Sequence, residues 1–229
     1  MDTIQLNHGV AMPQQGLGVF QMTDQAVCKE SVLTALQIGY RLIDTAACYG
    51  NEQAVGAAVR ESGIAREALF LTSKVWIQDA GYDKTMRSFE KTLKNLGTDY
   101  LDLYLIHMPY GDYHGSWRAM EELLRAGKVR AIGVCNFLPD RLCDLILSHG
   151  TIPAVNQIEL HPFCQQQKLR QLMERYQIRT MAWAPFAEGR NDIFRHPVLA
   201  AIGVQYGKTP AQVILRWLRQ EKIIAIPKS

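Results

Sequence analysis

Short apolar runs typical of buried strands recur along the chain, and apolar residues return at helical spacing in the longer stretches between them. The strand-like runs are QGLGVF, RLIDTA, LFLTSKVW, DLYLIHMP, AIGVCNF, AVNQIEL, RTMAWAPF and IIAIPKS. The clearest helical stretches are DQAVCKESVLTALQIG, YDKTMRSFEKTLKNLG, SWRAMEELLRAG and TPAQVILRWLRQ. Asp24 can cap the first helix, and Thr209 followed by Pro210 is a typical opening for the last.

Strands that alternate with helices, without a Pro-, Gly- or Ser-rich linker, predict an α/β fold with a parallel sheet. Residues 1–229 are therefore expected to form one domain, and eight strands fit a (β/α)8 barrel, which typically has about 250 residues. The first segment, IQLNHGVAMPQQG, is expected to form a β-hairpin outside the barrel. Two glycine motifs do not support a nucleotide-binding open sheet. Gly16-Leu17-Gly18 lacks the third glycine, and GVQYGKT has one residue too few for a P-loop.

The sequence ends at Ser229, just as the eighth strand finishes. No helix follows to cover the outer face of that strand. We expect the apolar side chains of Ile223 and Ala225 to be uncovered, which is an association liability. The last helix and C-terminal loop of the barrel are expected to be missing, so the chain would be part of a longer protein.

Composition narrows the class of protein without identifying it. The chain is 48% hydrophobic and 21% charged, and its net charge of +3 is scattered, which argues against a nucleic-acid partner. No apolar run reaches the roughly 20 residues of a membrane span, and no signal peptide is visible. The five cysteines form no CxxC pair, so reduced thiols and a cytoplasmic location are expected. We expect the protein to be a monomer and its substrate to be a small molecule.

Polar residues stand where several apolar runs end. RLID ends at Asp44, LFLTSK at Lys74 and LYLIH at His107, and Tyr49 follows Asp44 closely. Active residues of (β/α)8 barrels lie at the carboxyl ends of the strands, so we expect these side chains to meet at one rim. Singly, each has an ordinary structural explanation, such as a helix cap or a half-buried aromatic ring. Lys74 is harder to explain alone, because a buried lysine needs a partner, which Asp44 would supply.

Together these residues suit protonation of a carbonyl oxygen. An ammonium group favours a nearby phenolate, so Lys74 is expected to lower the pKa of Tyr49 from its reference value of about 10. His107 could hydrogen-bond the oxygen that Tyr49 protonates. Protonation of the oxygen while hydride reaches the carbon is carbonyl reduction, and only a cofactor can supply the hydride.

Six motifs, GYRLIDTAACYGNE, TSKVW, DLYLIHMP, GKVRAIGVCNF, NQIELHP and IPKS, make the chain resemble the aldo-keto reductase superfamily. They appear in order over nearly the whole chain. The segment HMPYGDYHGSWRAMEELLRAGKVRAIGVCNFLPDRL is most similar to bacterial members described as diketogluconate-reductase-like. The resemblance implies a (β/α)8 barrel that binds NADPH in extended form and reduces aldehydes or ketones to alcohols. It also implies that Asp44, Tyr49, Lys74 and His107 form a catalytic tetrad with Tyr49 as the proton donor.

The resemblance further implies which residues hold the cofactor and the substrate. Asn136 and Gln157 would hydrogen-bond the nicotinamide carboxamide, Trp183 would stack on its ring, and Lys228 would bind the phosphate of the adenosine half. The expected cofactor set is Asp44, Cys135, Asn136, Gln157, Trp183, Ala184, Pro185, Phe186, Lys228 and Ser229. The expected substrate set is Phe20, Trp76, His107 and Met108. No metal is expected, because Glu159 and His161 have no clear third ligand.

Three departures from the family pattern bear on the site. Cys135 stands where the family usually has serine, and a thiol is a weaker hydrogen-bond donor. Met108 replaces a tryptophan or glutamine, which bears on substrate choice. An arginine-bearing segment that follows IPKS in the family is absent from this sequence.

Two other functions remain open at this point. A Schiff-base lyase would explain Lys74 but leaves Tyr49, Trp183 and IPKS without a role. Borohydride trapping of a lysine adduct would reveal it. A cofactor-binding regulatory subunit would bind NADPH with negligible turnover, and the intact tetrad argues against it.

Overall fold

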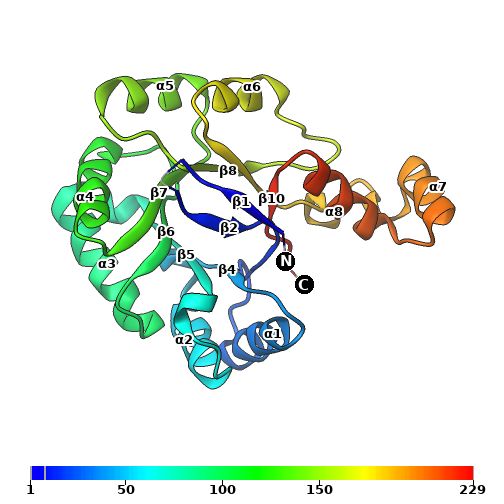
Figure 1. Ribbon diagram of the computed structural model, residues 1–229, viewed down its shortest axis with the longest axis horizontal. Helices are drawn as coiled ribbons and strands as arrows, with labels where there is room; N and C mark the ends of the chain where they lie inside the picture. The colour runs from blue at the N-terminus through cyan, green and yellow to red at the C-terminus, as the bar shows by residue number, and fades with distance from the viewer. Residues whose placement is uncertain (1, 8, 229) are drawn as a thin grey trace.

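The computed structural model describes residues 2–7 and 9–228 and confirms the predicted (β/α)8 barrel (Figure 1). The strands are β1 Thr3–Gln5, β2 Ala11–Pro13, β3 Gly16–Gly18, β4 Leu42–Asp44, β5 Phe70–Val75, β6 Leu101–Ile106, β7 Val129–Cys135, β8 Val155–Glu159, β9 Arg179–Trp183 and β10 Ile224–Ala225. The helices are α1 Gln25–Gln37, α2 Glu52–Glu61, α3 Tyr82–Leu96, α4 Tyr113–Arg125, α5 Pro139–Ser148, α6 Gln167–Arg175, α7 Pro197–Tyr206 and α8 Pro210–Gln220.

Strands β3 to β10 form one parallel sheet in chain order, and its two edges meet. The backbone N–H of Ala225 donates to the carbonyl of Gln14 at 3.0 Å, and the backbone N–H of Gly18 donates to the carbonyl of Pro227 at 3.0 Å. A Cβ at position 18 would lie 2.7 Å from the carbonyl oxygen of Ile226. Only glycine therefore allows the first and last strands to approach this closely.

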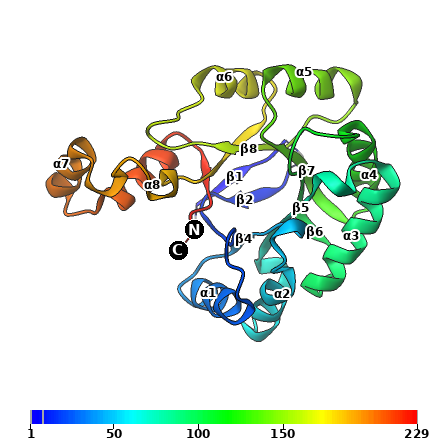
Figure 2. The same ribbon diagram turned by 180° about the vertical axis from the view of Figure 1, so that it is seen from behind.

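The predicted hairpin is confirmed as β1 and β2, which pair antiparallel with Ile4 opposite Met12 and form a sheet separate from the barrel strands. In Figures 1 and 2 the hairpin lies across the centre of the ring of barrel strands. Its apolar side chains pack with inward-facing residues of the strands. The side chain of Arg179, at the start of β9, donates to the carbonyl of Gln5 at 2.8 Å. The hairpin thus closes the amino-terminal end of the barrel and leaves the carboxyl ends of the strands open.

The helices surround the sheet, and their ends follow the signals in the sequence. Asp24 accepts a hydrogen bond from the N–H of Val27 at the start of α1, and Thr209 forms a capping box at the start of α8. Gly97 ends α3 in the left-handed conformation, with φ of 67°. No helix among the described residues is both long and apolar enough to cross a membrane.

The expected exposure of Ile223 and Ala225 is wrong. Their side chains are 1% and 3% exposed. Both belong to the cluster that contains Ile214 and Leu218 of α8. Helix α8, which precedes β10, folds back over the strand and covers these side chains, so no helix after the strand is needed to bury them.

Candidate active site

A buried ion pair lies at the open end of the barrel. Asp44 ends β4 and Lys74 lies near the end of β5, and their side chains are 2% and 0% exposed. Lys74 Nζ donates to Asp44 Oδ1 at 2.6 Å and to the carbonyl of Thr45 at 2.8 Å. Burial alone would lower the pKa of Lys74, but the negative charge of Asp44 raises it above the usual value. Lys74 is therefore a charged ammonium group at neutral pH.

A short helical turn presents Tyr49 to this pair. The turn spans Ala47–Tyr49 and ends at Gly50, whose φ of 69° suits glycine. Lys74 Nζ lies 3.4 Å from the Tyr49 hydroxyl, as a donor to it. The fully buried Asn51 holds the chain behind the turn, because its side chain accepts from Thr45 Oγ1 at 2.7 Å and donates to backbone carbonyls. The sequence placed these residues at one rim, and the structure brings them into contact.

Lys74 lowers the pKa of Tyr49 as predicted, but the net shift of that pKa is upward. Burial raises the pKa of Tyr49 to about 12, and the charge of Lys74 opposes this rise without cancelling it. Asp44 also contributes to the rise. Tyr49 is consequently a protonated donor at neutral pH, which is the form that an acid needs.

His107 lies beside Tyr49 as a neutral group. Burial, with a smaller effect from Lys74, lowers its pKa to about 3. Its ring contacts those of Tyr49 and Trp76 edge-on, with centroid distances of 5.6 and 4.9 Å. Nδ1 lies 3.4 Å from Cys48 Sγ, and Nε2 bonds to no residue that the structure describes. His107 can offer a hydrogen bond at neutral pH, but it cannot act as the acid.

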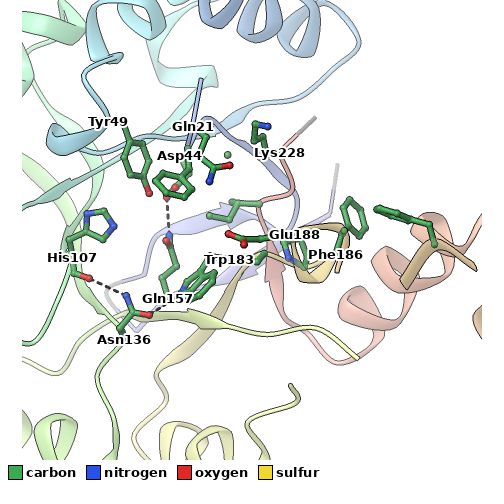
Figure 3. A pocket seen from close by; sticks show the side chains of 17 residues that line it. Gln21, Asp44, Tyr49, His107, Asn136, Gln157, Trp183, Phe186, Glu188 and Lys228 are labelled. Carbon is green, nitrogen blue, oxygen red and sulfur yellow. Dashed lines mark hydrogen bonds between the residues drawn. The ribbon is translucent and has the colours of Figure 1, made fainter. Parts of the chain in front are cut away.

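Two amide side chains and an indole lie on the strands opposite Tyr49 (Figure 3). Gln157, on β8, donates from Nε2 to Asp44 Oδ2 at 2.9 Å. Asn136, just after β7, donates to the carbonyl of His107 at 3.2 Å and accepts from Trp183 Nε1 at 2.9 Å. The tetrad and the predicted nicotinamide residues thus form one connected network.

A cavity of about 540 Å³ opens over this network. The predicted residues that line it are Phe20, Asp44, Tyr49, His107, Asn136, Gln157, Trp183, Ala184, Pro185, Phe186 and Lys228. Lys74 and Cys135 are fully buried and do not line it. Ser229 lies outside the described residues.

Two of the four predicted substrate residues are not part of the cavity wall. Trp76 packs its ring against that of His107. Met108 directs its sulfur toward Asn136 Nδ2, at 3.2 Å. Both residues therefore contact residues of the wall without lining the cavity, whereas Phe20 lines it and is 49% exposed.

Several residues of the cavity wall were not predicted from the sequence: Gly18, Gln21, Glu188, Gly189, Phe194 and Ile226. Gly18 and Gln21 flank Phe20, so the strand-end rule could have found them. The connection between β9 and α7 carries Glu188 and Phe194, and its path includes several residues with positive φ. Nothing in the sequence pattern indicates where such a connection runs.

The possible metal ligands Glu159 and His161 contact each other, with Oε1 and Nε2 3.3 Å apart. No group of three or more suitable ligands occurs within residues 2–7 and 9–228.

Comparison with known proteins identifies the family. Residues 9–229 match the model of the aldo/keto reductase family. Glyoxal reductase from Bacillus subtilis is 48% identical over 229 residues, which are 100% of this chain and 82% of the relative. Methylglyoxal reductase DkgA from Escherichia coli is 42% identical over 229 residues, 99% of this chain and 82% of the relative.

A solved structure agrees in fold as well as in sequence. A mutant of Gox0644 in complex with NADPH superimposes with a TM-score of 0.94 and 40% identity, and the match covers 100% of this chain and 83% of that one. The chain belongs to the aldo/keto reductase family and is an oxidoreductase. The predicted family and its bacterial branch are confirmed.

The lowered pKa of His107 predicts a specific loss of stability in acid. The unfolded chain binds a proton at His107 below about pH 6.5, whereas the folded protein does not until about pH 3, so stability falls as pH drops through this window. Between about pH 7.5 and about pH 5.5, the variant His107→Gln should lose about 1 kcal/mol less unfolding free energy than the wild type. Urea unfolding at the two pH values measures this difference. Equal losses in both proteins would contradict the assignment.

Proposed function

We propose that this enzyme uses NADPH to reduce aldehydes or ketones to alcohols, with Tyr49 as the proton donor. One observation carries the proposal. A protonated tyrosine and a neutral histidine face the same cavity, and a buried ammonium group lies 3.4 Å from the tyrosine hydroxyl. An acid, a neutral hydrogen-bond donor and a fixed positive charge are what reduction of a carbonyl oxygen requires.

The residues of the cavity fit a nicotinamide cofactor. Gln157 Nε2 donates to Asp44 Oδ2 and to Met181 Sδ, and Gln157 Oε1 accepts no hydrogen bond from the described residues. This unused acceptor suits the N–H of a carboxamide. Trp183 offers an aromatic face in the same wall, and Lys228 adds a positive charge that suits a phosphate group. When bound, NADPH supplies the hydride that adds to the carbonyl carbon.

The protein's own part of the reaction follows from the network. The substrate oxygen lies between the Tyr49 hydroxyl and the neutral His107, which holds it by a hydrogen bond. Tyr49 gives its proton to that oxygen, and Lys74 stabilises the phenolate that remains. Asp44 keeps the ammonium group in place throughout.

The two alternative functions gain no support. A Schiff-base lysine reacts as a neutral amine, whereas Asp44 keeps Lys74 protonated. A regulatory subunit would not require a tetrad in contact, as it is here.

The names of the relatives support a proposal for the substrate class. Relatives named for glyoxal and methylglyoxal reduction make small dicarbonyl compounds the first substrates to test. The contacts among Asp44, Lys74 and Tyr49 form within one copy of the chain, so the proposed monomer would already contain a formed tetrad. The free cysteines support a reducing, cytoplasmic environment.

Tyr49→Phe should reduce turnover of methylglyoxal with NADPH by at least about a hundredfold, since it removes the acid and keeps the ring. The dissociation constant for NADPH should stay within about twofold. Tyr40→Phe is a matched control, because the Tyr40 hydroxyl bonds to Gln15 away from the cavity. Near-normal turnover in Tyr49→Phe would exclude Tyr49 as the proton donor.

Lys228→Ala should weaken NADPH binding about tenfold and leave NADH binding nearly unchanged, because only NADPH carries the additional phosphate. Lys208→Ala removes another exposed lysine that does not line the cavity and serves as the control. Titration of each variant with both cofactors measures the effect. Equal weakening for the two cofactors would place Lys228 away from that phosphate.

A further inference from the structure

The side-chain amide of Asn136 is held in one orientation from both ends. Its Nδ2 donates to the carbonyl of His107 at 3.2 Å and approaches Met108 Sδ at 3.2 Å. Its Oδ1 accepts from Trp183 Nε1 at 2.9 Å. Figure 3 shows Asn136 between these partners, with His107 on one side and Trp183 on the other.

A flipped amide would lose both hydrogen bonds. Nδ2 would then face the indole N–H, which is a donor, and Oδ1 would face a carbonyl oxygen. The indole N–H has no acceptor role, so it can only select the oxygen end of the amide. The backbone is also fixed, because the N–H of Asn136 donates to the carbonyl of Gln157 at 2.9 Å.

The oxygen atom selected in this way retains a free lone pair. A carbonyl oxygen has two lone pairs, and Trp183 uses one. Both Asn136 and Trp183 line the cavity. A carboxamide N–H in the cavity can therefore bond to Asn136 Oδ1 while the indole N–H remains bonded to the same atom.

The geometry points to Trp183 as a positioning residue, whose indole N–H orients Asn136 Oδ1 to accept the carboxamide N–H of the nicotinamide. This role rests on the proposed function and is separate from stacking of the indole face. Phenylalanine at the same position would present an aromatic face but no N–H. The role therefore predicts a loss that depends on the carboxamide of the cofactor and not on the ring alone.

The test compares NADP⁺ with its acetylpyridine analogue, which has a methyl group in place of the carboxamide NH₂. Calorimetry measures the binding of both by the wild type, by Trp183→Phe and by a protein with benzothienylalanine at position 183. Benzothienylalanine keeps the bicyclic ring and replaces the N–H with sulfur, so packing is preserved. Loss of the N–H should weaken NADP⁺ binding about fivefold more than analogue binding, about the effect of one net hydrogen bond.

A ratio of about three or more between the two weakening factors, in the benzothienylalanine protein, supports the role. A smaller ratio overturns it, because Trp183 would then act through its ring alone. Asn136→Ala completes a double-mutant cycle. In that background, loss of the indole N–H should weaken the binding of NADP⁺ and of the analogue equally. A persistent distinction would also overturn the role.

A measurement without cofactor separates this role from the proposed function. In the proton NMR spectrum, the indole N–H resonance of Trp183 can be assigned by its absence in Trp183→Phe. This resonance should move upfield in Asn136→Ala, because the hydrogen bond to Asn136 is lost. An unmoved signal overturns the role. Failure of the wild type to bind NADP⁺ or to reduce carbonyls would instead overturn the proposed function.

Discussion

The buried contact between Lys74 and Asp44 is the interaction on which the rest of the site depends. An isolated ammonium group in the barrel would be very costly, so the structure must supply a partner for each of its three N–H groups. Asp44 and the carbonyl of Thr45 take two, at 2.6 and 2.8 Å. The Tyr49 hydroxyl, at 3.4 Å, is left as the third. Satisfying the buried lysine thus also fixes the position of the tyrosine.

The barrel makes this arrangement possible by holding neighbouring strand ends in register. Asp44 of β4 is paired with Thr72 of β5. Lys74 lies two residues after Thr72 on the same strand, so its side chain points to the same, inner side of the barrel. Asn51 ties the tyrosine turn to the loop after β3 by donating to the carbonyl of Val19 at 2.9 Å. The hairpin fills the opposite end of the barrel, and this leaves only the carboxyl end open for a ligand.

Strand order was predictable from the alternation of apolar runs with helical stretches, and Asp44, Lys74 and His107 from the polar residue that ends each run. The pKa of Tyr49 was not, because its direction depends on how much burial outweighs the charge of Lys74. Packing of α8 over Ile223 depends on how a helix folds back on its strand, which spacing does not reveal. The bond between Trp183 and Asn136 depends on two side-chain orientations. Motif spacing predicts that such residues are neighbours, but not which atoms meet.

The pH dependence of alcohol oxidation in Lys74→Met tests the central role of the ion pair most directly. In this direction Tyr49 must first lose its proton, and Lys74 is the charge that lowers its pKa. We predict that the residual oxidation rate of the variant rises at a higher pH than the rate of the wild type. A pH profile that is unchanged in position, whatever the fall in rate, would contradict it.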